Sequence, residues 1–198
     1  MNLENCKLFS GLDPQYIEEL LKKISYNIKK YEKHDLICTQ FNFSKELGII
    51  LKGNVFVYKS LYNGDNFLLN RLEKNDLLGL ACIYGNTKIF PSEMQATKTT
   101  EILFFSQESL NNLFLLEPQI LKNFLDIMSN KIVFLNNKIE MMAISSIKER
   151  LEWLIYKNIY SADSLSKVNK TQLCCELGTS RSSLYRALNE FYNNKWLL

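Results

Sequence analysis

The pattern of apolar and polar positions divides the chain into segments of different period. An amphipathic segment runs from Asp13 to about Ser25 and opens with Asp13-Pro14, a pair typical of helix starts. From Asn27 to about Phe105, short apolar runs alternate with turn residues. This change of period predicts a short N-terminal helix followed by a region of strands.

The strand region carries clear turn signals. In the run GIILKGNVFVYKS, Val55 and Val57 fall on one side and Phe56 and Tyr58 on the other, as in a half-buried strand. Asn63-Gly64-Asp65 lies between two apolar runs and predicts a hairpin turn. Further turn signals are Gly53, Gly79, Gly85 and Pro91. Strands this short and closely spaced predict an antiparallel sandwich or barrel.

Beyond Pro118 the period becomes helical. Seven apolar residues recur at spacings that alternate between four and three: Leu121, Leu125, Met128, Ile132, Leu135, Ile139 and Met142. This heptad seam predicts one helix of about 40 Å, at 1.5 Å per residue, that pairs with its copy in a homodimer. The alternative is that the seam packs on the barrel of its own chain. We assign that contact to a neighbouring apolar face formed by Phe124, Ile127 and Phe134.

The C-terminal region predicts three further helices. The first covers residues 147–160 and is followed by the polar linker SADSLSKVN. In the next, Leu173, Cys174 and Leu177 supply the inward positions of a short helix. Gly178 can adopt the left-handed conformation of a tight turn.

The last predicted helix begins after that turn. Ser180 is a suitable N-cap residue, and Leu184 and Leu188 supply the inward positions. This is the spacing of a helix-turn-helix motif, whose second helix enters the major groove of DNA. The alternative is a plain helical hairpin with solvated charges.

The exposed positions of this motif suit DNA. Arg181, Ser182, Tyr185 and Arg186 occupy the early exposed face of the second helix, where side chains meet base edges. An arginine can bond guanine at two atoms. Three further residues are placed for phosphate contacts: Lys170, Thr171 and Lys195.

Charge supports a polyanion partner at this end of the chain. Residues 1–145 hold sixteen Lys and Arg against sixteen Asp and Glu, whereas residues 146–198 hold eight against five. The whole net charge of +3 therefore lies in the last quarter. No signal peptide or membrane-spanning run is present, so we expect a cytoplasmic protein without membrane contact.

Candidate catalytic and metal-binding chemistry is sparse. The five cysteines are scattered and never form a C-x-x-C pair, so neither a disulfide framework nor a metal site is predicted. His34 is the single histidine, and no phosphate-cradling glycine loop occurs. We therefore expect a protein that is not an enzyme.

These features resemble a known family. LGTSRSSLYRALNEF resembles the helix-turn-helix of CRP/FNR transcription regulators, and YEKHDLIC, ILKGNVFVY and LEKNDLLGLACIYG resemble their barrel segments. The resemblance implies an α+β fold with a cyclic-nucleotide-binding-like antiparallel β-barrel (jelly roll) and an N-terminal helix over 1–117. It also implies a dimerisation helix over 118–144 and a winged-helix/helix-turn-helix DNA-binding domain over 145–198. The family continues past the segment equivalent to 194–198 into a β wing, so we expect the wing to be truncated or missing.

The resemblance also implies a function and partners. It implies a homodimeric regulator that binds a palindromic operator on double-stranded DNA and contacts RNA polymerase. Arg181, Ser182 and Arg186 would inherit base or backbone contacts, with Tyr185 at a further groove-facing position. The best-known family pattern has glutamate where Ser182 stands, and the FNR pattern has serine where Tyr185 stands, so the operator sequence does not follow.

The family's known effectors fit poorly. A cyclic-nucleotide site needs a glutamate directly after the glycine, but Gly79 is followed by Leu80, and the anchors for the cyclic phosphate are replaced by Phe90 and Pro91. Burying an unpaired phosphate is costly, so we do not expect cyclic AMP. An iron–sulfur cluster needs four thiolates, and only Cys6 lies near the N-terminus, so this cofactor is not expected either.

A different effector remains open. The predicted pocket is more apolar than a nucleotide site and comprises Leu80, Ala81, Tyr84, Phe90, Met94 and Gln95. It suits an unidentified small organic molecule or haem, or it is vestigial. For haem, His34 would be the only histidine ligand, but it replaces a turn glycine of the family pattern, so we expect a surface residue. The alternative function is a ligand- or haem-sensing barrel with a degenerate DNA-binding module.

Overall fold

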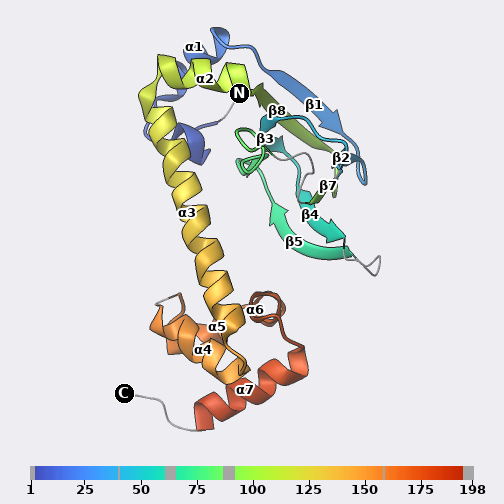
Figure 1. Cartoon of the computed structure of the whole chain (residues 1–198), viewed down its shortest axis with the longest axis vertical. Coiled ribbons are helices and arrows are strands. Elements are labelled where there is room, and N and C mark those ends of the chain that lie inside the picture. The colour runs from blue at the N-terminus through green and yellow to red at the C-terminus, as the bar shows by residue number, and fades with distance from the viewer. Residues whose placement is uncertain (1–2, 40, 61–65, 87–91, 158, 194–198) are drawn as a thin grey trace. The chain divides into compact units, whose positions relative to one another are not determined.

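The computed structural model describes residues 3–39, 41–60, 66–86, 92–157 and 159–193 (Figure 1). The chain forms two compact units, Met1–Ser129 and Asn130–Leu198. One continuous helix, α3 (Pro118–Ala143), contributes its first half to one unit and its second half to the other. Each unit is described by itself.

Antiparallel sheets make up most of the first unit. Within the described residues the strands are β1 (Asn27–Tyr31), β2 (Leu36–Cys38), β3 (Glu46–Lys52), β4 (Val55–Ser60), β5 (Asn66–Leu72), β6 (Leu77–Leu78), β7 (Glu93–Ala96) and β8 (Thr100–Ser106). They form two four-stranded sheets in the orders β1-β8-β3-β6 and β2-β7-β4-β5. All of their pairings are antiparallel, which confirms the predicted barrel of jelly-roll type.

Alternation along β8 divides the first unit into two apolar cores. Because side chains alternate across a strand, Ile102 and Phe104 pack inside the barrel, whereas Leu103 and Phe105 pack on the helices. All four are buried. The sheet that contains β8 is therefore covered on both faces.

The helical layer covers the outer face of that sheet. It consists of a short 3-10 helix (Lys7–Phe9), α1 (Pro14–Lys22), α2 (Gln107–Leu116) and the first half of α3. The predicted start of α1 is confirmed, since the Asp13 carboxylate accepts hydrogen bonds from the backbone N–H groups of Gln15 (2.8 Å) and Tyr16 (3.4 Å). Apolar burial against the sheet then holds the layer in place.

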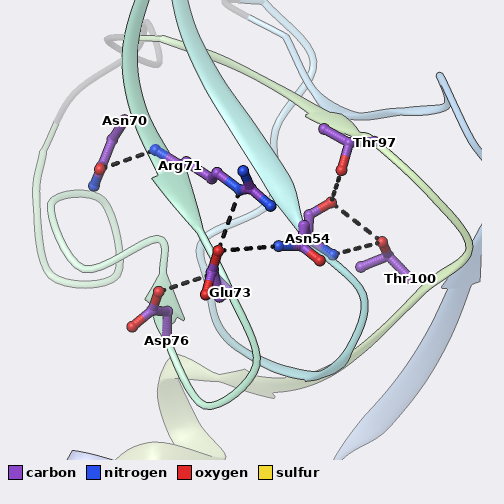
Figure 2. Close-up of polar contacts among 7 residues, drawn as sticks. All are labelled: Asn54, Asn70, Arg71, Glu73, Asp76, Thr97 and Thr100. Atoms are coloured by element: carbon purple, nitrogen blue, oxygen red, sulfur yellow. Dashed lines mark hydrogen bonds and ion pairs between the residues drawn. The ribbon is translucent and has the colours of Figure 1, made fainter. Parts of the chain in front are cut away.

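A polar network fastens three turns at one end of the barrel (Figure 2). Asn54 is buried, and its backbone N–H donates to Thr100 Oγ1 (3.3 Å) while its carbonyl accepts from Thr97 Oγ1 (3.2 Å). Its side-chain amide donates to Glu73 Oε1 (3.3 Å), which also receives Arg71 Nε (3.2 Å). Since each group has a partner, the turns close without a buried orphan at Asn54.

The second unit is entirely helical in its described part. Besides the second half of α3 it contains α4 (Ile147–Tyr156), α5 (Ala162–Lys167), α6 (Lys170–Leu177) and α7 (Arg181–Asn193). They share one apolar core, whose fully buried members include Leu151, Leu165, Leu173 and Leu184.

The prediction that SADSLSKVN is a polar linker is wrong in part. Residues 162–167 form α5, because Ser161 and Ser164 cap each other reciprocally at 3.1 Å and 2.9 Å and Leu165 anchors the turn in the core. The preceding helix ends at Tyr156, earlier than the predicted 160.

Candidate nucleic-acid interface

The turn between α6 and α7 is set by three local features. Gly178 has φ +63°, the left-handed conformation that the sequence predicts there. The backbone N–H of Thr179 donates to the carbonyl of Cys174 (3.0 Å), which closes α6 in a Schellman-type end. Ser180 Oγ accepts the N–H of Ser183 (3.2 Å), confirming the predicted N-cap of α7. The sequence of the turn thus determines where α6 ends and where α7 begins.

α7 has one buried and one exposed face. Leu184, Ala187, Leu188 and Phe191 are buried in the core of the second unit or against it. The four residues predicted to meet bases are all exposed: Arg181, Ser182, Tyr185 and Arg186. Within the described part of the chain, neither arginine forms an ion pair with a carboxylate.

Two predicted contact residues already bond each other. Arg181 Nη2 donates to Thr171 Oγ1 (2.5 Å), so the predicted base contact and a predicted phosphate contact lie side by side. Ser182 Oγ lies 2.9 Å from Ser180 Oγ. Lys170 Nζ donates to the carbonyl of Leu165 (2.5 Å), so this lysine supports the junction of α5 and α6. Lys195 lies outside the described residues.

The predicted seam is an exposed apolar stripe on α3. Six of its members are between 38% and 67% exposed: Leu121, Leu125, Ile132, Leu135, Ile139 and Met142. Met128 is half-buried and packs on the helical core of the first unit. Exposure of so many large apolar side chains along one helix is typical of an interaction surface.

The second apolar face of α3 is only partly as predicted. Phe124 is buried and Ile127 is half-buried against the first unit's core. The prediction for Phe134 is wrong, because its side chain is 55% exposed, with the Lys131 ammonium 5.1 Å from the centre of its ring. Periodicity gives the face of the helix, but not how far along it the covering layer extends.

The predicted pocket residues point in different directions. Met94 is buried inside the barrel, whereas Gln95 alternates to the outer face of β7 and donates to the carbonyl of His34 (3.0 Å). Leu80 packs on the helical layer, and Ala81 is exposed. Phe90 lies outside the described residues.

Tyr84, the remaining predicted pocket residue, also turns to the helices. Its hydroxyl donates to Asn111 Oδ1 (2.6 Å), and its ring meets that of Phe124 edge-on at 5.9 Å. The structure therefore does not bring the described members of the set together around one space.

His34 and the thiols have ordinary structural positions. His34 is exposed in a left-handed turn (φ +76°), and its backbone N–H donates to the carbonyl of Ala96 (2.8 Å). Cys6 is buried, and burial raises the pKa of its thiol to about 11. Cys38 is half-buried, and burial raises the pKa of its thiol to about 12. Among the residues that the structure describes, no three metal-binding side chains gather.

Sequence reasoning missed the groups that support the turn from outside the motif. Lys138 and Arg150 donate to the last carbonyls of α6, and the Tyr160 hydroxyl donates to Glu176 Oε2 (2.8 Å). Burial and the bond to Glu176 raise the pKa of Tyr160 to about 12. No sequence signal identifies these partners, because the acceptors are backbone atoms of a different helix.

None of the described helices is long and apolar enough to cross a bilayer.

The fold is similar to solved regulator structures. The catabolite activator protein of Thermus thermophilus has a TM-score of 0.64 and 17% identity, over 95% of this chain and 87% of that one. A CooA mutant from Carboxydothermus hydrogenoformans has a TM-score of 0.61 and 20% identity, over 96% of this chain and 88% of that one. The c-di-GMP responsive regulator CLP of Xanthomonas campestris has a TM-score of 0.59 and 16% identity, over 92% of this chain and 93% of that one.

Sequence comparison gives the family of the barrel. No curated protein matches the sequence closely enough to count as a relative. Residues 28–116, however, match the sequence model of the cyclic nucleotide-binding domain. The resemblance inferred from the sequence is thereby confirmed: residues 28–116 resemble a cyclic nucleotide-binding domain, and the chain has the fold of the solved transcription regulators named above.

Proposed function

We propose that this protein is a homodimeric transcription regulator that binds a palindromic operator through α7. The observation that carries the proposal is the exposed face of α7, where Arg181, Ser182, Tyr185 and Arg186 stand together and no carboxylate among the described residues pairs with either arginine. The fold supports a regulator rather than an enzyme. Double-stranded DNA and RNA polymerase are the proposed partners.

The contacts of α7 suit a major groove. A guanidinium can bond guanine O6 and N7 together, which is worth about 1–3 kcal/mol of discrimination against another base. Arg181 would exchange its bond with Thr171 for such a contact, and the Thr171 hydroxyl, which only accepts in that bond, can donate its own proton to a phosphate. Lys170 and Lys195 would add phosphate contacts, and thereby affinity and salt dependence.

Dimerisation would supply the second half-site. Two copies of α3 that pair along the exposed seam would bury six large apolar side chains at once. The two copies of α7 would then have to lie about 34–36 Å apart to read successive major grooves.

The effector we propose is not cyclic AMP. The position after Gly79 is Leu80, whose side chain packs on the helical layer, so the carboxylate that would hold a ribose hydroxyl is lacking. Haem is disfavoured as well, because His34 lies exposed in a turn. An unidentified small organic molecule is the remaining candidate.

DNA binding can be tested by fluorescence anisotropy with fragments from upstream of the protein's own gene. We expect the wild type to bind one fragment with a steep salt dependence. Arg181→Ala and Arg186→Ala should each weaken binding to that fragment by about tenfold, within the range of one bidentate base contact. Lys148→Ala on α4, which removes a cation engaged with Glu152, is the matched control and should bind as the wild type does.

Two results would contradict parts of the proposal. A folded dimer that binds no DNA even at low salt would favour the alternative of a sensing barrel with a degenerate DNA-binding module. Equal losses on all sequences for the arginine variants would assign these side chains to phosphates instead of bases.

A further inference from the structure

We infer that Arg150 is a positioning residue for DNA binding, which fixes the turn before α7 to the end of α3 without itself touching DNA. The inference rests on the proposed function, because it concerns the orientation of α7 as a DNA-reading helix. It is carried by contacts within the second unit alone.

The end of α6 is a place where supporting bonds are needed. The last four carbonyls of a helix have no partner within the helix and carry the negative end of its dipole. In α6, the carbonyl of Cys174 accepts the N–H of Thr179 from the turn itself. The carbonyls of Glu176 and Leu177 accept from cations on α3 and α4.

Arg150 joins two helix ends with one planar group. Its Nη1 donates to the carbonyl of Leu177 (2.7 Å), the last residue of α6. Its Nε donates to the carbonyl of Ile144 (2.7 Å), the residue that follows α3. Because the guanidinium is planar and its donors have fixed directions, the two carbonyls are held at a set separation and angle.

A second cation supports the neighbouring carbonyl. Lys138, in the second half of α3, donates to the carbonyl of Glu176. On the same half-helix, Glu140 accepts Trp153 Nε1 (2.8 Å) and Lys157 Nζ (3.1 Å) from α4. Met141 is buried in the core that also contains the inward residues of α6 and α7. The second half of α3 and the α6–α7 pair are therefore held together by polar and apolar contacts.

This arrangement links the seam on α3 to α7. The seam residues Ile132, Leu135, Ile139 and Met142 lie on the same half of α3 that carries Lys138 and precedes Ile144. Leu177 directly precedes Gly178, and α7 begins three residues later. A rotation of α3 in the dimer would thus be passed to α7 through bonds that end at the turn itself.

The test uses the full chain and three variants. Arg150→Gln removes the charge and the planar guanidinium, whereas Arg150→Lys keeps the charge but cannot replace both bonds. Lys148→Gln is the control, since Lys148 lies on the same helix and pairs only weakly with Glu152 (3.9 Å). Hydrogen exchange of the DNA-free protein and anisotropy with specific and unrelated DNA are measured for each.

The expected result distinguishes an Arg150 that positions α7 from an Arg150 that contacts DNA. Arg150→Gln and Arg150→Lys should both speed the exchange of amides 178–183 and lower specific affinity by about tenfold, the size expected for losing a hydrogen bond to a charged group. Affinity for unrelated DNA and its salt dependence should stay within about twofold of the wild type, because no phosphate contact is removed. Lys148→Gln should change none of these.

Three outcomes would overturn the inference: unchanged exchange at 178–183, an Arg150→Lys variant equal to the wild type, or equal losses on specific and unrelated DNA with a shallower salt dependence. If Arg150→Gln does not fold, Lys138→Gln tests the same link through Glu176 and should show the same pattern. If the wild type binds no DNA, the proposed function fails, whereas the exchange measurement still shows whether Arg150 holds residues 178–183 in place.

Discussion

Two glycines show how far a single residue can be understood from the sequence. Gly178 has φ +63°, and a Cβ there would meet no atom within 4 Å. Gly53 has φ +98°, and a Cβ there would lie 2.2 Å from Thr100 Oγ1. The left-handed conformation of Gly178 was predictable because the turn is local. The crowding at Gly53 was not, because Thr100 is 47 positions away and comes close only in the folded barrel.

The two positions should respond differently to alanine. We expect Gly178→Ala to lower the free energy of unfolding by about 1–2 kcal/mol, the cost of a left-handed conformation alone. Gly53→Ala should cost about 1–3 kcal/mol more, because the methyl group also overlaps Thr100. Urea unfolding of both variants checks the difference, and equal losses would show that the contact at Gly53 relaxes freely.

At the scale of elements, periodicity predicted faces well and their coverage poorly. The seam, the strand alternation at Val55 and Val57, and the inward leucines of α7 follow from spacing alone. Phe134 and the helix at 162–167 did not, since each depends on what the rest of the chain places beside it. The pocket residues failed to converge for a similar reason: neighbours in sequence such as Met94 and Gln95 face opposite sides of a strand.

The exposed seam leads to a test of the proposed dimer. We expect the double substitution Leu125→Glu and Ile132→Glu to convert a dimer into a monomer, because pairing would bury unpaired carboxylates. Both side chains are 55% exposed in the single chain, so its own fold should be little affected. Light scattering gives the mass and circular dichroism the helix content.

A matched control is available on the same helix. Asn130 is exposed and lies on the opposite side of α3 from the seam in the heptad pattern, so Asn130→Glu should remain dimeric. A seam variant that keeps the mass of the wild type would show that subunits associate elsewhere.

At the scale of the whole molecule, the order of elements was the most predictable property. A short helix, a barrel, a long helix and a helical end follow from changes of period, and the family match at 28–116 agrees with the barrel. The supports of the turn between α6 and α7 were not predictable, because Lys138 and Arg150 bond carbonyls whose place depends on the packing of four helices. Every residue has a backbone carbonyl, so the sequence does not show which carbonyl accepts a side-chain hydrogen bond.

Buried and half-buried groups that ionise at high pH make the stability of both units depend on alkaline pH. Burial raises the pKa of Cys6 to about 11 and of Cys38 to about 12 in the first unit, and burial with Glu176 raises the pKa of Tyr160 to about 12 in the second. A group whose pKa is higher in the folded state stabilises the fold fully below its unfolded value. That stability is lost as the pH rises through the folded value.

We therefore expect the free energy of unfolding to fall between pH 9 and 12, with Cys6 alone contributing a loss on the order of 2 kcal/mol because the unfolded thiol ionises near pH 8.5. Urea unfolding at pH 8, 9.5 and 11 measures the slope. Cys6→Ala lowers stability at every pH by leaving a small cavity, but it should flatten the slope between pH 9 and 11, because no thiol remains to ionise. A slope unchanged in Cys6→Ala would mean that water reaches this thiol in the folded state and that its ionisation is not coupled to folding.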